Sequence, residues 1–431
     1  MVSDISKLYE IFLDHPHIST DSRNVSPGSI FFALKGEHFN GNIYAAKALE
    51  SGASYAVIDQ NEFAADSRFI IVDDVLTSLQ MLARYHRDQL VIPIIGITGS
   101  NGKTTTKELT GNVLAGKMNA YWTKGNLNNH IGVPLSVLSI NRDTEIAVIE
   151  MGANHCGEIA SLCQIADPNF GIITNIGKAH LQGFGGYEGV IRAKSELYDH
   201  IRQHGGKLFV NEDDQLLLNL SKGIETITYG ICNEASLPGD IISEFPFLSV
   251  RIDFHGSPVS ISSQLIGSYN FHNIMAAACI GNYFGVSPKK IKDAIEGYNP
   301  ENNRSQFIRT DRNHIVMDAY NANPSSMEAA ITHFAKFPDD RKVLILGDML
   351  ELGEESLPEH RRILELALQS GAGQVILIGE IFNQVCNDDR ITTFTTSDQA
   401  ISKLSEQPLT GKTILLKGSR GIRLEKLLAI L

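Results

Sequence analysis

The sequence predicts an α/β protein of three domains, two of which carry mostly parallel sheets. The chain has 431 residues, which is too long for one ordinary domain. Short apolar runs rich in β-branched residues alternate with helix-length segments, a pattern typical of parallel sheets covered by helices. The alternation stops in a polar stretch at residues 297–304 and then resumes. We therefore expect two such sheets, preceded by a smaller N-terminal region.

The N-terminal region, residues 1–88, mixes short strands with helices. We expect strands at residues 29–34, 55–58 and 69–72. The run at 75–89, VLTSLQMLARYHRDQ, has apolar residues at helical spacing. It therefore predicts a helix that leads out of this region.

The central region, residues 89–304, opens with LVIPIIGIT at 90–98. A continuous apolar run of this kind is typical of a strand buried on both faces. Similar runs predict strands at residues 146–150, 170–174 and 207–210. Residues 240–263 are rich in β-formers, with a turn expected at HGSP (255–258), and helical periodicity returns at 273–294. This order predicts a mostly parallel sheet with a β-rich extension.

The C-terminal region, residues 305–431, repeats the alternation after the polar linker at 297–304. Strands are expected at residues 315–318, 343–346, 375–378 and 413–416. Helices between them predict a second doubly wound sheet. Because ligands of such sheets bind at the carboxyl ends of the strands, polar residues there are the candidates for chemistry.

Composition narrows the class of protein. The net charge is 37 − 49 = −12, so the chain lacks the basic footprint of a nucleic-acid-binding protein. No segment has the roughly 18 continuous apolar residues of a membrane helix, and the first residues do not resemble a secretory signal. The five cysteines are scattered and form no CxxC pair, which favours a reducing compartment. We therefore expect a cytoplasmic protein with no nucleic-acid partner and no integral membrane contact.

Residues 96–106, GITGSNGKTTT, follow the buried strand and precede an expected helix at 107–114. Glycines let backbone N–H groups close on phosphate oxygens, while Lys103 supplies a positive charge and Thr104 a hydroxyl for Mg²⁺. The strict phosphate-loop pattern has glycine where Ile97 stands, so the match is to a variant, T-G-x-x-G-K-T-T. The alternative is a glycine-rich turn with a chance Lys-Thr. The loop alone does not separate kinase, ATPase, GTPase and ligase.

Three ionisable residues follow or flank the central strands. Glu150 ends the strand IAVIE, where a carboxylate is placed to bind Mg²⁺, although a solvated strand-end glutamate is equally common. His180 lies just beyond the next strand, but a lone histidine is usually structural, and Mg²⁺ prefers oxygen ligands. Lys194 lies in a segment of helical character, and its spacing alone indicates a surface lysine.

Several asparagines and strand-end residues have plain structural interpretations. Asn270 and Asn273 could cap a helix. Asn323 fits an N-cap with Pro324 as the first helical residue. The remaining polar residues at strand ends are Asp318, Asp348, Glu351 and Arg420.

These segments together resemble the Mur ligase superfamily over nearly the whole chain. In the family's order they are TGSNGKTT at 98–105, Glu150, TNIGKAHL at 174–181, the Lys194 segment, Asn270 with Asn273, and Arg304. The phosphate loop by itself is moderately specific.

Four further segments resemble the superfamily members that add D-alanyl-D-alanine to UDP-N-acetylmuramoyl-tripeptide. They are GNLNNHIGVPLSVL at 125–138, DAYNANPSSMEAAI at 318–331, LGDMLELG at 346–353 and LKGSRG at 416–421. DSR at 21–23 and PGSIFFALKGEHFNG at 27–41 match the family's uridine-binding region. YNANPSS together with KGSRG is highly specific.

The resemblance implies a division of labour among the three domains. A small N-terminal α/β domain would hold the UDP moiety through Ser22 and Lys35. A central P-loop domain would bind ATP, and a C-terminal Rossmann-like domain would close over it and bring in the dipeptide. The loop residues implied in ATP binding are Gly99, Ser100, Asn101, Gly102, Lys103, Thr104 and Thr105, with Asn273, Arg304 and Asp318 for adenine, phosphate and ribose.

The resemblance also implies roles in the reaction. Lys103 would contact the β- and γ-phosphates, Thr104 and Glu150 would hold one Mg²⁺, and His180 would help to bind a second. Lys194 matches a lysine that is carbamylated in several family members. The substrate-facing residues would be Asn126 and Asn129 for the muramoyl-peptide, and Asn321, Asn323 and Arg420 for the dipeptide.

The implied reaction is an ATP-dependent, acyl-phosphate-forming amide ligation by a monomer. Another Mur-type enzyme or a folylpolyglutamate-type ligase is an alternative. A folate enzyme should lack the DSR and ALKG segments, and the diaminopimelate-adding enzyme should carry a DNPR-like motif, which we do not find. A P-loop ATPase or kinase would need no amine acceptor. A non-catalytic nucleotide sensor would require that Lys103 and Glu150 be dispensable.

Overall fold

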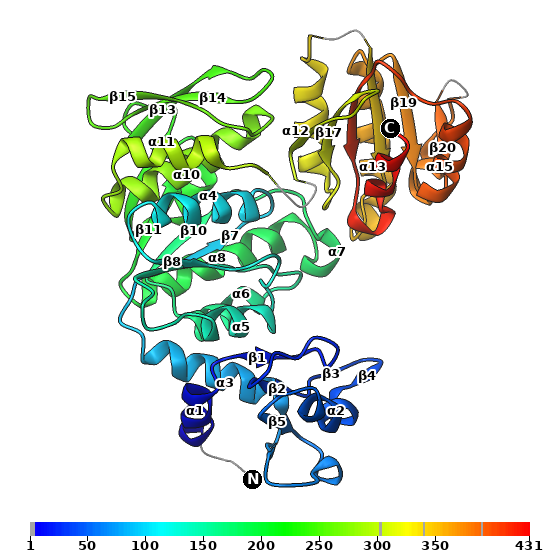
Figure 1. Ribbon diagram of the computed structural model, residues 1–431. Coiled ribbons are helices and arrows are strands. Elements are labelled where there is room, and N and C mark those ends of the chain that lie inside the picture. The colour runs from blue at the N-terminus through cyan, green and yellow to red at the C-terminus, as the bar shows by residue number, and fades with distance from the viewer. Residues whose placement is uncertain (1–4, 301–303, 339–340, 389–390) are drawn as a thin grey trace.

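The computed structural model describes residues 5–300, 304–338, 341–388 and 391–431. Its sheets lie in three successive bodies, with the N-terminal one at the bottom of Figure 1, the central one in the middle and the C-terminal one at the upper right. The α/β class predicted from the sequence is confirmed. The domain boundaries at residues 88 and 304 stay predictions.

The N-terminal domain is a four-stranded parallel sheet of order β1-β2-β5-β6, beside a small antiparallel ribbon of β3 and β4. Its strands are β1 (Ile18–Ser19), β2 (Ile30–Phe32), β3 (Lys35–Gly36), β4 (Phe39–Asn40), β5 (Tyr55–Ile58) and β6 (Phe69–Ile71), and its helices are α1 (Ile5–Asp14), α2 (Ala45–Glu50) and α3 (Val75–Asp88). All three predicted strands are present.

Helix α3 joins the N-terminal and central domains. Asp74 precedes its first residue, and the Asp74 carboxylate accepts a hydrogen bond from the Thr77 N–H (2.7 Å) and so caps the helix. At its other end, His86 Nε2 lies 2.8 Å from the Ile140 carbonyl and Arg87 Nε donates to the Ala166 carbonyl (3.0 Å). The predicted connecting helix is therefore confirmed, and it is fixed to the central domain by polar contacts.

The central domain is a nine-stranded sheet of order β15-β14-β13-β12-β11-β10-β7-β9-β8. The strands from β8 to β13 are parallel, and β13, β14 and β15 are antiparallel. Their bounds are β7 (Ile94–Thr98), β8 (Ala120–Trp122), β9 (Ile146–Glu150), β10 (Phe170–Ile173), β11 (Lys207–Asn211), β12 (Glu225–Gly230), β13 (Leu237–Ser243), β14 (Ser249–Asp253) and β15 (Pro258–Ser262).

Helices cover both faces of this sheet. They are α4 (Lys103–Ala115), α5 (Gly132–Leu138), α6 (Glu158–Ala166), α7 (Leu181–Phe184), α8 (Tyr187–Gln203), α9 (Gln215–Leu220), α10 (Phe271–Tyr283) and α11 (Pro288–Gly297). Ile94 of β7 belongs to the core built with α5, α6 and α8, whereas the next residue, Ile95, belongs to the core built with α4, α10 and α11. Alternate side chains enter opposite cores, which explains the continuous apolar runs.

Three predictions for the central domain needed correction. The helix after the phosphate loop, expected at residues 107–114, begins four residues earlier, at Lys103. Strand β7 begins at Ile94 rather than at residue 90, because Pro93 has no N–H to donate to the ladder and Val91 is fully exposed. The single helical stretch at 273–294 is two helices. Gly285, with φ 72°, follows the end of α10, and Pro288 is the first residue of α11.

The C-terminal domain is a six-stranded sheet of order β16-β17-β21-β18-β19-β20, parallel except for β16. Its strands are β16 (Gln306–Arg309), β17 (His314–Asp318), β18 (Lys342–Gly347), β19 (Gln374–Ile378), β20 (Thr392–Phe394) and β21 (Thr413–Lys417), and its helices are α12 (Pro324–Ala335), α13 (Ser356–Gln369), α14 (Glu380–Val385) and α15 (Ser397–Glu406). The four predicted strands are all present.

The start of α12 and the preceding linker bear on two predictions. Asn323 is the N-cap of α12, Pro324 is its first residue, and Asn323 and Ser326 form a reciprocal capping box. The predicted cap is therefore confirmed. In the linker at 297–304, residues 301–303 lie outside the described residues, and α11 continues through Gly297.

Within the described ranges, none of the helices combines the length and the apolar character that crossing a bilayer requires.

Candidate active site

A cleft of about 1230 Å³ lies where the three domains meet. Its walls include the phosphate loop, residues at the carboxyl ends of β9 and β10, residues of α3, and Asp318 and Lys417 at the carboxyl ends of β17 and β21. The carboxyl ends of both parallel sheets therefore face one cavity, as the doubly wound pattern predicts.

The phosphate loop connects β7 to α4 in a conformation that requires glycine. Gly99 and Gly102 have φ of 144° and 79°. A Cβ at Gly102 would lie 2.5 Å from Asn273 Oδ1, and one at Gly99 would lie 2.0 Å from Thr174 Oγ1. The Asn101 N–H donates to Asn175 Oδ1 (3.0 Å), which fixes the loop to the end of β10. The loop therefore has the shape and the glycines that close approach to phosphate demands.

Lys103, the first residue of α4, points back into this loop. Its Nζ donates to the carbonyls of Gly99 (2.6 Å) and Ser100 (3.3 Å). Burial lowers the pKa of Lys103 to about 8, although the charge of Glu150 raises it and Arg304 lowers it further. An ammonium that burial disfavours gains stability from a bound anion, so this position suits a phosphate.

Glu150 at the end of β9 is 1% exposed and receives two hydrogen bonds on one oxygen. Asn128 Nδ2 donates to its Oε1 (2.7 Å), and so does Thr104 Oγ1 (3.3 Å). The other oxygen, Oε2, has no hydrogen-bond partner among the described residues. A buried carboxylate oxygen that accepts no hydrogen bond, beside a threonine hydroxyl, fits the ligand set of Mg²⁺.

Lys107, one turn beyond Lys103, is fully buried beneath this carboxylate. Its Nζ lies 3.7 Å from Glu150 Oε2 and 2.9 Å from Glu108 Oε1, and it donates to the Gly125 carbonyl (3.1 Å). Its charge offsets that of Glu150 inside the protein. No sequence signal singled out these two residues. Lys107 directly follows the phosphate-loop segment 96–106, and Asn128 lies within GNLNNHIGVPLSVL at 125–138.

Lys194 on α8 is 2% exposed, so its interpretation as a surface lysine was wrong. The face of α8 that carries it packs into the core, with Nζ 5.3 Å from the centre of the Phe184 ring. Burial lowers the pKa of Lys194 to about 7, and the charge of Lys103 lowers it as well. Much of this lysine is therefore an uncharged amine near neutral pH.

His180 lies in the cleft at the boundary with the C-terminal domain. Its Nδ1 contacts the carboxylate of Glu351 directly. Burial lowers the pKa of His180, against the raising effect of Glu351. Nearby, Lys178 Nζ lies 2.6 Å from Glu359 Oε1. One ion pair and one histidine–carboxylate hydrogen bond thus connect the segment after β10 to the C-terminal domain, and the sequence indicated neither contact.

Asn270 and Asn273 do not cap α10 with their side chains. Asn270 occupies the N-cap position, but its Nδ2 donates to the Ile266 carbonyl (2.8 Å). Asn273 lies inside the helix, where Oδ1 accepts from Thr106 Oγ1 (3.1 Å) and Nδ2 donates to Asn270 Oδ1 (2.8 Å). Both line the cleft beside the phosphate loop, so the capping interpretation was wrong for both.

The predicted adenine-, phosphate- and ribose-contacting residues lie in the cleft together with two residues that sequence analysis missed. The Arg304 guanidinium lies 3.7 Å from the centre of the Tyr320 ring. Asp318 Oδ2 lies 2.6 Å from Lys417 Nζ. Tyr320 lies within the quoted DAYNANPSS segment and Lys417 within LKGSRG, which was the only signal for either residue.

Four predicted substrate residues line the cleft, and the side chains of two of them, Asn129 and Asn323, make hydrogen bonds beyond their own neighbouring residue. Asn126 and Asn321 are exposed there. Asn129 Oδ1 accepts from the Gly132 N–H (2.9 Å) at the start of α5. Asn323 Nδ2 donates to Asn101 Oδ1 (2.8 Å), which joins the C-terminal domain to the phosphate loop.

Three predicted substrate residues lie outside the lining of the cleft. Ser22 is half-buried in the N-terminal domain, and Lys35 is exposed there, with Nζ 2.9 Å from Asp59 Oδ2. Arg420 is exposed, with its guanidinium 5.2 Å from the Tyr320 ring centre. The roles predicted for all these residues stay predictions.

Three family profiles match the chain in order. The Mur ligase family catalytic domain matches residues 16–87, the Mur ligase middle domain residues 97–281, and the Mur ligase glutamate ligase domain residues 303–420. A protein of Bacillus subtilis (strain 168) named UDP-N-acetylmuramoyl-tripeptide–D-alanyl-D-alanine ligase is 34% identical, over 95% of this chain and 92% of that protein. The chain belongs to the Mur ligase family. The membership predicted from the sequence is confirmed.

Solved structures resemble this Mur ligase over nearly its full length. A crystal structure of MurF from Acinetobacter baumannii superposes with a TM-score of 0.86 at 30% identity, covering 96% of this chain and 92% of that one. MurF ligase from Thermotoga maritima in complex with ADP superposes with a TM-score of 0.85 at 27% identity, covering 97% of both chains. This Mur ligase therefore has the three-domain architecture of those structures.

Proposed function

We propose that this Mur ligase joins D-alanyl-D-alanine to UDP-N-acetylmuramoyl-tripeptide in an ATP-dependent step of peptidoglycan synthesis. The observation that carries the proposal is the single cleft in which a phosphate loop, a buried carboxylate and residues of the C-terminal domain meet. A full-length relative at 34% identity is named for this reaction, and a structural neighbour at 27% identity is described in complex with ADP.

The residues of the cleft suit ATP and Mg²⁺. Thr104 and Glu150 would hold one ion, and His180 would help with a second after leaving Glu351. Bound there, Mg²⁺ would neutralise charge on the transferred phosphoryl group. The fit rests on Glu150 Oε2, which accepts no hydrogen bond from the described residues, and on the glycine loop that ends at Lys103. Asn273, Arg304 and Asp318 would contact the rest of the nucleotide.

The reaction would proceed in two steps. The terminal carboxylate of the tripeptide attacks the γ-phosphate, and ADP leaves with the electrons of the broken P–O bond. The Lys103 ammonium, held at the loop, faces the developing negative charge. The amine of D-alanyl-D-alanine then attacks the acyl phosphate, loses a proton, and displaces inorganic phosphate as the amide forms.

The C-terminal domain would exclude water, which would otherwise hydrolyse the acyl phosphate. Its contacts with the central domain support that role. Lys178 pairs with Glu359, and Asn323 bonds to Asn101 of the phosphate loop itself. Asn321, Asn323 and Arg420 would receive the dipeptide.

Lys194 would act as a carbamate. Its buried, largely uncharged amine can attack CO₂, forming an N–C bond and releasing one proton. The product is an anion that the neighbouring charge of Lys103 would stabilise, since that charge now disfavours the ammonium form.

The muramoyl substrate would extend from the N-terminal domain into the cleft. Ser22 and Lys35 would hold its UDP end, while Asn126 and Asn129 would face the peptide. Leu76 and Gln80 of α3 line the cleft, so its wall reaches the helix that joins the two domains. We also propose that the enzyme is a cytoplasmic monomer with domain boundaries near residues 88 and 304.

The test is phosphate release from ATP with UDP-N-acetylmuramoyl-tripeptide, with and without D-alanyl-D-alanine. We expect release to require both substrates and the product to gain the mass of the dipeptide less water. Release without the dipeptide would identify an ATPase, and release with glutamate instead would identify a folylpolyglutamate-type or other ligase. ATP binding without turnover would identify a nucleotide sensor.

A further inference from the structure

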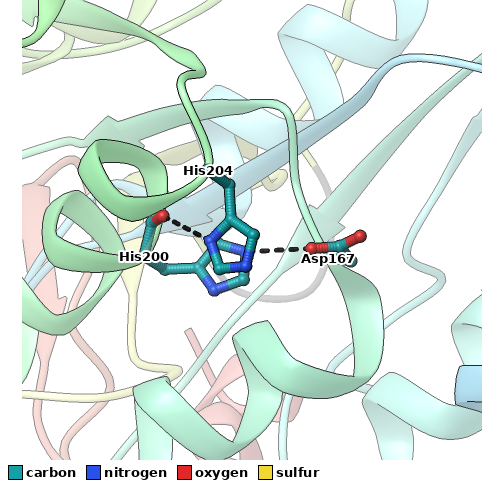
Figure 2. A group of neighbouring side chains, drawn as sticks. All are labelled: Asp167, His200 and His204. Carbon is teal, nitrogen blue, oxygen red and sulfur yellow. Dashed lines mark hydrogen bonds and ion pairs between the residues drawn. The ribbon is translucent and has the colours of Figure 1, made fainter.

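Asp167, His200 and His204 gather on the central domain (Figure 2), and none of the three lines the cleft. Each offers a ligand atom, and these atoms all lie within 4.8 Å of one another. Asp167 follows α6 and precedes β10, so it lies at the edge of the sheet opposite to the carboxyl ends that form the cleft. Over the described ranges, no other group of three histidine, cysteine or carboxylate side chains meets this distance criterion.

The two histidines are four residues apart at the end of α8 and present parallel rings. Their ring centres are 4.1 Å apart with an interplanar angle of 22°. His204 Nδ1 lies 2.8 Å from the backbone carbonyl of His200. A carbonyl only accepts, so Nδ1 carries the proton and Nε2 keeps a free lone pair. A hydrogen bond from the other ring nitrogen to a carbonyl is also what orients most metal-binding histidines.

The aspartate faces the imidazoles with one oxygen and an arginine with the other. Asp167 Oδ1 lies 3.2 Å from His200 Nε2, and Asp167 Oδ2 lies 3.6 Å from Arg84 Nη1. Two ligands at about 2.0–2.1 Å from a tetrahedral Zn²⁺ ion lie roughly 3.3 Å apart. The Asp167–His200 separation is therefore already that of two ligands of one ion.

We propose that Asp167, His200 and His204 bind a divalent transition-metal ion of the Zn²⁺ type, with water completing the coordination. Two imidazoles and one carboxylate are a ligand set that suits Zn²⁺ rather than the oxygen-preferring Mg²⁺. Because the two rings are stacked and each lone pair lies in its ring plane, binding one ion requires at least one ring to rotate. Binding also moves the shared proton of His200 from Nε2 to Nδ1, so both rings stay neutral. His204 is exposed, which gives the ion a path to the site from solvent.

Two arginines near the three ligands influence the affinity of the site for a metal ion. Arg84 opposes a cation, because its guanidinium competes for Asp167 Oδ2. Arg87 Nη2 donates to the Asp167 carbonyl (2.9 Å), which holds the backbone of this residue in place.

The bound ion would fasten the end of α8 to the connection between α6 and β10. Through Asp167 this connection already contacts Arg84 and Arg87 of α3, the helix that joins the N-terminal domain. An ion that binds only the folded protein stabilises it by mass action. The site is therefore structural, and it is separate from the Mg²⁺ chemistry of the cleft.

The test is calorimetric titration of the chelator-treated full-length protein with Zn²⁺ in excess Mg²⁺. We expect one Zn²⁺ per chain at this site and a rise in melting temperature on binding. His204→Gln and Asp167→Asn should each weaken that binding at least about tenfold. Because His204 is exposed and outside the cleft, His204→Gln should fold normally and keep full activity with Mg²⁺.

Two further variants sharpen the result. His272 Nε2 lies 2.9 Å from Asp213 Oδ2 in a pair without a third ligand, so His272→Gln should leave Zn²⁺ binding unchanged. Arg84→Gln, which removes the competing charge, should tighten it severalfold. Unchanged Zn²⁺ affinity in both His204→Gln and Asp167→Asn, or no Zn²⁺ binding by the unmodified protein, would overturn the proposal.

Discussion

Replacing Asn128 by alanine should weaken the response to Mg²⁺ without affecting the fold. Asn128 makes the shortest hydrogen bond to Glu150, with 2.7 Å from Nδ2 to Oε1. A hydrogen bond to a charged group contributes about 1.5–3 kcal/mol. If that contribution orients the carboxylate for the metal, its loss corresponds to about a 10- to 150-fold change in Mg²⁺ affinity. The range agrees with the about 10- to 100-fold cost that is typical when a metal ligand loses a hydrogen-bond partner.

The assay is the free Mg²⁺ concentration that gives half-maximal phosphate release at saturating ATP and both other substrates. For Asn128→Ala that concentration should rise by at least about tenfold. Asn126→Ala is the matched control, because Asn126 lies in the same loop and the same cleft but is expected to face the muramoyl-peptide. It should raise the KM for that substrate and leave the Mg²⁺ response alone. An unchanged or tighter Mg²⁺ response in Asn128→Ala would refute the reasoning.

Three further perturbations test the loop and the buried lysines. Gly102→Ala forces alanine to φ 79° and places its Cβ 2.5 Å from Asn273 Oδ1. The left-handed backbone alone costs about 1–2 kcal/mol. The affinity for ATP, measured by calorimetry, should therefore fall at least about 5- to 30-fold. Because the pKa of Lys103 is lowered to about 8, its ammonium form is present below that pH and lost above it. The value of kcat/KM for ATP should therefore fall about tenfold per pH unit well above pH 8. A profile that stays flat to pH 10 would contradict this role of Lys103. Removal of dissolved CO₂ and bicarbonate should lower the rate of phosphate release by the unmodified enzyme, and added bicarbonate should restore that rate. The Lys194→Arg variant should release phosphate slowly with or without bicarbonate. A rate of the unmodified enzyme that does not depend on CO₂ would contradict carbamylation of Lys194.

The sequence predicted strands best where burial on both faces leaves no ambiguity. The run at 146–150 is β9 residue for residue, because every position of it is buried. The run at 90–98 was too long by four residues, since its apolar beginning includes Val91, which is exposed, and Pro93. Short edge strands such as β8 and β20 were not predicted, because three residues carry too little periodicity.

The polar residues were assigned correctly only where their hydrogen-bond partners are near in the sequence. Asn323 was assigned correctly as a cap, because the cap depends on Pro324 and Ser326 within the same turn. Asn270 and Asn273 were assigned incorrectly, because their partners include Thr106 and Ser305, which are distant in the chain. Sequence composition near a helix start cannot distinguish a side chain that caps the helix from one that reaches another element.

The sequence by itself determined the order of the strands and helices of two doubly wound sheets, the phosphate loop ending in Lys103, and the strand-end position of Glu150. These depend on contacts within a few residues and on the local period of apolar side chains. Only the tertiary structure decided that Lys194 is buried, that Asn128 holds Glu150, and that His180 meets Glu351 across 171 residues of chain. Desolvation and ion pairing arise where distant segments pack together, so no local pattern records them.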